Sequence, residues 1–180
     1  GHIGGAEDFA LELASDFGVN PVITSDSRIQ NRLCIDSFGV GWGWRRSGDQ
    51  ESWNQLMFGL AQGEKIAVSQ TSGTDLWKTS KAANISIEDP IHGLNSTRRL
   101  LIGPKAHSQC CWHPATLWIG IGCVRDLSEE FLESSFEKLF EESGLSKEAI
   151  AGLATVDIKS DEKAILSFAK SKGWPIRFFK

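Results

Sequence analysis

The last third of the chain alternates apolar runs with amphipathic stretches, and this alternation constrains its fold more than any other feature. An apolar run at residues 116–122 predicts a buried β-strand, and residues 152–158 form a second such run. An amphipathic helix is expected after each run, and residues 175–179 have the pattern of a short closing strand. Because strand–helix alternation favours parallel pairing, we expect residues 107–180 to form an α/β domain. The expected form is a layered α/β/α sandwich with a mixed or mostly parallel sheet.

The two expected helices carry start and stop signals. Asp126 can cap the first helix, with Glu129 three residues later in a capping-box-like arrangement. The second helix is expected over residues 161–172, with Gly173 as its stop. Both junctions place polar residues at the carboxyl end of a strand, where open α/β sheets bind ligands.

The first 106 residues have weaker patterns and are expected to form a second small α/β unit. A helix is predicted over residues 5–17, with Gly18 as its cap, and further elements are a helix at 53–61 and a strand at 65–69. The region 83–109 is polar and rich in Gly and Pro, with one expected strand at 100–102. The domain boundary is placed in that region, which gives domains 1–106 and 107–180.

Composition and charge exclude several classes of function. The chain is 41% apolar and 23% charged, as in ordinary globular proteins. A net charge of −4 argues against a nucleic-acid partner. No apolar run reaches the roughly 18 residues of a membrane span, and no secretion signal is visible, so we expect a cytoplasmic protein without a membrane partner. Since the chain starts at Gly1, inside a motif, we interpret it as a portion of a longer protein.

The cysteines and their neighbouring histidines raise the question of a metal site. His107, Cys110, Cys111 and His113 are metal-binding residue types, but their spacing fits no familiar zinc site. Adjacent Cys110 and Cys111 do not suit a regular disulfide framework either. A loop with chance Cys and His residues is the favoured interpretation, and no resident metal is expected.

The opening motif GHIGGA precedes the first expected helix. Gly4 and Gly5 let backbone approach a ligand closely, and amide groups at a helix start favour an anion. His2 can act as a base or a donor near pH 7. The alternative is a tight turn with an incidental histidine.

The polar residues at the two strand–helix junctions are the second candidate site. Gly122 and Arg125 follow the first strand, and the arginine fork suits a carboxylate. Asp157 and Lys159 follow the second, and alternation along a strand would put them on one side. The alternatives are a turn that needs small residues, a solvated arginine, and acids at a helix start. For Asp161 and Glu162 this last alternative is favoured, because the helix dipole attracts acids.

Tryptophan is dense in the first half of the chain, at Trp42, Trp44, Trp53 and Trp77. Such rings can stack on a flat macrocycle. Filling of a core or an interface is the commoner use and is the favoured interpretation.

Together these motifs resemble the cobalamin biosynthesis protein G family, the cobalt-precorrin-5A hydrolases. The matching residues are Gly120–Cys123, Arg125, residues 143–146, 157–159, 161–162 and 175–179, and the opening residues 1–6 and 21–24. Residues 26–109 match poorly, and residues 72–77 look like the cyanobacterial branch. In that branch the hydrolase is often joined to a precorrin methyltransferase. Glu7 stands where the family usually has Asn.

The resemblance implies an enzyme of vitamin B12 biosynthesis that opens the δ-lactone of cobalt-precorrin-5A and releases acetaldehyde, giving cobalt-precorrin-5B. Its substrate is a tetrapyrrole-derived corrinoid with carboxylate arms, which carries the cobalt, so no protein cofactor is implied. The expected catalytic base is His2 or Asp157. The expected substrate-binding residues are Gly4, Gly5, Gly122, Arg125 and Lys159. The alternative is a non-catalytic corrinoid-binding or accessory module, which can be attached to a precorrin methyltransferase.

Overall fold

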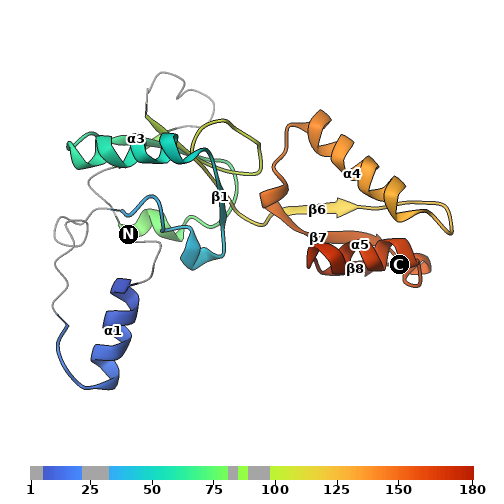
Figure 1. Ribbon diagram of the computed structural model, residues 1–180, viewed down its shortest axis with the longest axis horizontal. Helices are drawn as coiled ribbons and strands as arrows, with labels where there is room; N and C mark the ends of the chain where they lie inside the picture. The colour runs from blue at the N-terminus through green and yellow to red at the C-terminus, as the bar shows by residue number, and fades with distance from the viewer. Residues whose placement is uncertain (1–5, 22–32, 81–84, 89–97) are drawn as a thin grey trace.

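The structure is a computed structural model that describes residues 6–21, 33–80, 85–88 and 98–180. Within these residues the chain forms one five-stranded and one three-stranded β-sheet (Figure 1). The regular elements of this part of the chain are, in order, α1 (Ala6–Asp16), η2 (Val40–Trp42), β1 (Arg45–Ser47), α3 (Gln50–Ala61), β2 (Ile66–Gln70), η3 (Leu76–Ser80), β3 (Ile85–Glu88), β4 (Arg99–Ile102), β5 (Cys111–His113), β6 (Leu117–Gly120), α4 (Glu129–Ser143), η4 (Lys147–Ala149), β7 (Ile150–Val156), η5 (Asp157–Lys159), α5 (Lys163–Lys172) and β8 (Ile176–Phe179). The predicted α/β class is confirmed.

The five-stranded sheet has the order β1-β5-β4-β2-β3, in which β1 is antiparallel to β5 and the other pairs are parallel. The expected strands near 65–69 and 100–102 correspond to β2 and β4. Region 83–109 also supplies β3, and β1 and β5 were not predicted. Because β5 belongs to this sheet, the second sheet begins only at Leu117. The expected boundary at 106/107 therefore falls between two strands of one sheet, and the division into two domains stays a prediction.

Tryptophan side chains fill the core between this sheet and α3. Trp44, Trp53 and Trp77 are buried there, together with Trp112, which is 1% exposed. The rings of Trp53 and Trp112 meet edge to face, with centroids 6.0 Å apart. Trp42 differs from them, since 41% of it is exposed. Core filling, the favoured interpretation, therefore holds for three of the four tryptophans considered as a stacking platform.

The three-stranded sheet has the order β6-β7-β8, and both pairs are parallel. Its helices α4 and α5 pack against each other, and Phe136 of α4 meets Phe168 of α5 with ring centroids 5.3 Å apart. Both rings share one hydrophobic core with Leu153 at the centre of the sheet. Two helices on one side make a two-layer unit in the described part of the chain. The third layer expected of an α/β/α sandwich is absent from these residues.

The start of α4 differs from the expectation. Ser128 caps this helix and accepts a hydrogen bond from the Phe131 amide at 3.2 Å, whereas Asp126 lies before the cap with φ at +57°. Aspartate tolerates this left-handed conformation better than most residues, so it serves the turn and leaves capping to Ser128. The expected stop of α5 is confirmed, since Gly173 follows it with φ at +68°.

Helix α1 forms where the sequence predicts it, and Gly18 follows it with φ at +62°. Its apolar stripe is not covered by the described residues, because 60% of Phe9 and 76% of Phe17 are exposed. In Figure 1 the helix lies apart from both sheets. Across the described ranges, every helix is too short or too polar to cross a lipid bilayer.

Backbone hydrogen bonds join the two sheets. Ala106 donates its amide proton to the Gly144 carbonyl at 2.9 Å, and Ser146 donates to the Pro104 carbonyl at 2.8 Å. Thr116 donates to the Ala149 carbonyl at 2.9 Å, and this bond extends the pairing of β6 with β7 within the three-stranded sheet. We call the first two bonds the joint.

Candidate functional site

The carboxyl ends of β6 and β7 lie at one edge of the three-stranded sheet. Gly120 pairs with Ala154, so the residues that follow both strands emerge side by side. Two more bonds extend the pairing: Ile121 donates its amide proton to the Ala154 carbonyl, and the Thr155 hydroxyl donates to the Ile121 carbonyl, both at 2.8 Å. We call the ionisable residues at this edge, Arg125, Asp157, Lys159, Asp161 and Glu162, the strand-end cluster.

Arg125 connects the two junctions. Its Nη1 donates to Asp161 Oδ1 at 2.5 Å, and its Nη2 donates to the Ile158 carbonyl at 2.7 Å. The guanidinium therefore ties the loop after β6 to the turn after β7. It is neither a simply solvated arginine nor an open clamp, because the chain's own Asp161 already occupies the fork. The expected role of Arg125 in binding a substrate carboxylate stays a prediction.

The ion pair shifts the pKa of both partners in opposite directions. The hydrogen bond from Arg125 holds the pKa of Asp161 below its ordinary value, and the same bond raises the pKa of Arg125. A carboxyl whose folded pKa is lowered stabilises the fold above its unfolded pKa. That contribution is lost as the pH falls through the lowered folded pKa.

This ion pair leads to a measurable titration. In a carboxyl ¹³C NMR titration, Asp161 should titrate below its ordinary pKa of 3.8. In Arg125→Gln its midpoint should move up toward that value, because the hydrogen bond and the charge are both lost. Arg45→Gln, which removes the same charge from the other sheet, should leave the midpoint in place. An unchanged Asp161 midpoint in Arg125→Gln would show that the two side chains do not pair in solution.

Asp157 and Lys159 lie on η5 rather than on a strand, so the expectation that alternation puts them on one side is wrong. Strand β7 ends at Val156, which pairs with Phe179 in β8, and no residue of β6 pairs beyond Ala154. Without a partner the backbone turns, and Ser160 donates its amide proton to the Asp157 carbonyl at 2.9 Å. Asp157 is exposed and Lys159 is half-buried.

Glu162 is the buried acid of the strand-end cluster, with only 4% of its surface exposed. The sequence interpretation favoured an acid at a helix start, and Glu162 is the N-cap residue of α5, but its burial was not predicted. Its charge contributes to the raised pKa of Arg125, after the larger effects of Asp161. Helical periodicity carried a signal for this burial, because Glu162 lies three residues before buried Ile165 and seven before buried Ala169.

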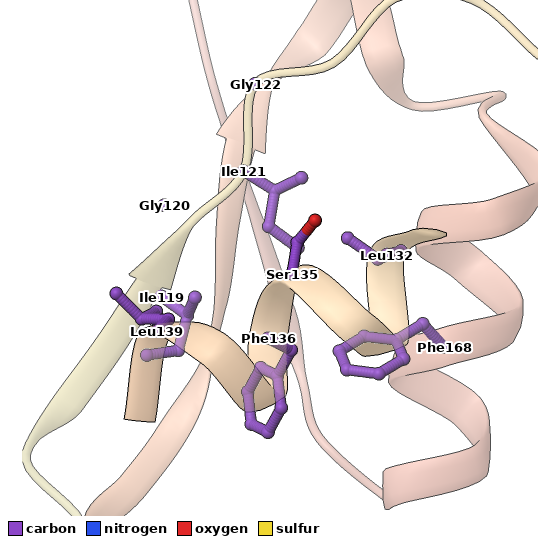
Figure 2. Close-up of a pocket in the computed structure, with 9 residues that line it drawn as sticks. All are labelled: Ile119, Gly120, Ile121, Gly122, Leu132, Ser135, Phe136, Leu139 and Phe168. Carbon is purple, nitrogen blue, oxygen red and sulfur yellow. The ribbon is translucent and has the colours of Figure 1, made fainter. Parts of the chain in front are cut away.

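An apolar pocket of about 170 Å³ adjoins the end of β6. Figure 2 shows that Ile119 and Ile121 come from this strand end, whereas Ser135 and Leu139 come from α4. Gly122 lies on its rim, and a Cβ built there would meet no atom within 4 Å. The pocket can take a small apolar group, with the Ser135 hydroxyl as a polar contact. A substrate-binding role for Gly122 stays a prediction.

The opening motif cannot be compared in the same way. His2, Gly4 and Gly5 lie outside the described residues. Helix α1 begins at Ala6, directly after the glycine pair. Their expected roles as base and as backbone donors stay predictions.

Of the residues considered as a metal cluster, His107 is exposed, whereas Cys110, Cys111 and His113 are buried. His113 is 1% exposed, and its ring joins Ser47 Oγ through Nε2 and the Gly103 carbonyl through Nδ1, both at 2.7 Å. Burial raises the pKa of Cys110 to about 11 and that of Cys111 to about 12, so both thiols are protonated at neutral pH. No set of three or more potential metal ligands converges among the described residues.

Sequence reasoning missed the pairing of Ser47 with His113. The two residues are 66 positions apart and meet only because β1 and β5 are neighbours. Burial lowers the pKa of His113, which favours the neutral ring. With its proton on Nδ1, bound to the Gly103 carbonyl, Nε2 accepts from the Ser47 hydroxyl. The pair thus adds a side-chain link to the backbone pairing of two short strands.

Comparison with known proteins relates this chain to proteins of cobalamin synthesis. Residues 117–180 match the family model described as cobalamin synthesis G C-terminus. Over 99% of its length, the chain is 30% identical to a protein named cobalt-precorrin-5A hydrolase from Priestia megaterium. It covers 52% of that relative, so it spans about half the length of the curated protein that it matches.

A solved structure also matches this chain over nearly its whole length. It is the crystal structure of a cobalamin biosynthesis protein G homolog from Sulfolobus solfataricus, 20% identical, with 98% of this chain and 50% of that chain covered. The TM-score is 0.34, and a score this low supports no conclusion.

Proposed function

Because the chain belongs to the cobalamin biosynthesis protein G family, we propose that it takes part in the hydrolysis of the δ-lactone of cobalt-precorrin-5A. The observation that carries this proposal is the 30% identity to a cobalt-precorrin-5A hydrolase over 99% of the chain. The chain covers 52% of that relative. The activity of the whole relative is therefore a proposal for this chain.

The chemistry of the strand-end cluster agrees with this proposal. Hydrolysis of a lactone adds water to the carbonyl carbon and breaks the ring C–O bond, so a base must take a proton from water. The freed alkoxide then becomes the aldehyde oxygen as its carbon breaks its bond to the macrocycle, the macrocycle carbon takes up a proton, and acetaldehyde leaves. Asp157 is exposed at the strand end and offers a carboxylate for that purpose. Lys159 brings positive charge to the same edge, which suits a substrate with many carboxylate arms. Arg125 joins it where a substrate carboxylate replaces Asp161 on the guanidinium. His2 is the other candidate base.

The apolar pocket next to the cluster supports the same kind of ligand. A corrinoid combines an apolar ring system with charged arms. The strand end offers both kinds of contact, since the pocket of about 170 Å³ extends to Gly122 and the ionisable residues follow the same strand ends in the chain. No protein cofactor is proposed, because the cobalt arrives with the substrate.

The test is an anaerobic incubation of the 180-residue chain with cobalt-precorrin-5A, in which acetaldehyde is trapped and quantified. Acetaldehyde above a protein-free control supports hydrolysis by this chain. Saturable binding of the corrinoid without acetaldehyde would favour the alternative, a corrinoid-binding accessory module. If the corrinoid does not bind and no acetaldehyde forms, both proposed functions are contradicted. Association with a precorrin methyltransferase, in the same polypeptide or as a partner, is a further proposal that co-purification can test.

A further inference from the structure

A second pocket lies on the five-stranded sheet, between α3 and the starts of β4 and β5. Its volume is about 300 Å³, and its polar wall consists of Ser52, Gln55, Arg98, Arg99, Gln109 and Cys110. The strand-end cluster belongs to the other sheet, so this pocket is a separate place on the molecule. The proposed function makes no use of it.

Guanidinium groups determine the charge of the pocket. Among the described residues that line it, two are arginines and none is acidic. Glu64 lies outside the wall and pairs with Arg98 at 3.0 Å. Arg99 is the first residue of β4 and is half-buried. Both arginines line the same hollow, and positive charge in a hollow surface favours a ligand that carries negative charge.

The position of Arg98 is held by helix α3. Its Nη1 donates to the Gln55 carbonyl at 3.2 Å, and its Nε pairs with Glu64. A Cβ on Gly59 would lie 1.7 Å from Arg98 Nη1, so the glycine lets the guanidinium pass close to the helix, and a larger residue there would displace it. Glycine inside a helix costs about 0.5–1 kcal/mol relative to alanine. The helix carries this cost at the point where the arginine crosses it.

The remaining wall is neutral or balanced. Burial, followed by the charge of Asp49, raises the pKa of Cys110 to about 11, so its thiol carries no negative charge at neutral pH. Arg46 acts on the same thiol in the opposite sense. The Asp49 carboxylate is itself engaged as the cap of α3 and accepts from the Ser52 amide at 2.7 Å. Gln109 is exposed at the mouth and adds amide donors.

We propose that this pocket binds an oxyanion, the carboxylate or phosphate group of a small molecule. Guanidinium forks bind both groups through paired N–H donors. The volume of about 300 Å³ is at the lower end of ligand pockets, which suits a compact anion or one acidic arm of a larger molecule. The proposal depends on the geometry of this pocket and stands whether or not the chain hydrolyses a corrinoid.

The test is isothermal titration calorimetry at low ionic strength with two probes, inorganic phosphate and the tricarboxylate tricarballylate. The informative variant is Gln109→Glu, which adds a negative charge at an exposed position of the wall and leaves the core untouched. Its dissociation constant should rise about tenfold or more, because a carboxylate then opposes the ligand. The matched control is Gln62→Glu at the exposed end of α3, outside the pocket, which should bind as the unaltered chain does.

A second pair removes a positive charge instead of adding a negative one. Arg99→Gln should weaken binding by about tenfold, whereas Arg45→Gln on β1 should leave it unchanged. Binding of phosphate alone, of tricarballylate alone or of both supports the proposal and identifies the source of the oxyanion. Two results would overturn the proposal. The first is that neither probe binds saturably. The second is that Gln109→Glu and Gln62→Glu weaken probe binding equally, because the weakening would then come from the net charge of the protein and not from the pocket.

Discussion

Replacement of Trp112 by alanine is expected to lower the free energy of unfolding by about 4 kcal/mol, within the usual range for a large buried aromatic side chain. Trp112 is 1% exposed, and its ring contacts Trp53 and Phe38 edge to face. Its Nε1 donates to the Ile35 carbonyl at 2.8 Å, so the substitution also leaves a buried carbonyl without a donor.

Urea unfolding followed by circular dichroism checks this value. The control is Trp42→Ala, which removes a ring that is 41% exposed and should cost less than about 1 kcal/mol. Trp112→Phe should recover part of the loss, since it restores ring packing but not the hydrogen bond. Similar losses for Trp112→Ala and Trp42→Ala would mean that the tryptophan core does not dominate the stability of this sheet.

The second large effect concerns turnover and rests on the proposed function. Asp157→Asn should lower the rate of acetaldehyde release by about 100-fold, the lower end of the usual contribution of a general base. Asparagine keeps the shape of the side chain but cannot take a proton from water. Corrinoid binding should change little, because Arg125 and Lys159 retain their charges.

Single-turnover kinetics with trapped acetaldehyde, together with a binding titration, separate these two effects. Asp16→Asn on α1 is the matched control, with the same change of charge on an exposed acid. If Asp157→Asn keeps full turnover, Asp157 is not the base and the assignment moves to His2. If Asp157→Asn loses binding and turnover equally, Asp157 binds the substrate and is not the general base.

Much of the three-stranded unit could be predicted from the sequence, because its apolar runs and helical stripes are long. Residues 152–158 already indicated β7, and Gly173 marked the end of α5. The errors there are local: Asp126 was expected to cap α4, yet Ser128 does so. Two capping residue types within three positions are hard to separate by pattern alone. Asp157 was expected to continue β7, but β7 ends at Val156 because the neighbouring strands β6 and β8 pair no further.

The five-stranded sheet was harder to predict for a physical reason. Strands β1 and β5 have three residues each, and no period can be read from so few. Their pairing depends on contacts between distant positions, such as Ser47 with His113. The two-arginine pocket has the same origin, since Arg98 meets Gly59 only after β4 has packed beside α3. A pattern read along the chain does not contain such contacts.

The joint between the sheets has a consequence for how this protein can change over evolutionary time. Its two bonds run between main-chain atoms, so most substitutions at these positions keep them. Proline is the exception at Ala106 or Ser146, because it has no amide proton to donate. Each unit can therefore vary its surface residues while the mutual orientation of the sheets is inherited unchanged. The two-arginine pocket and the strand-end cluster could therefore change independently during evolution, while the contact between the two sheets stays the same.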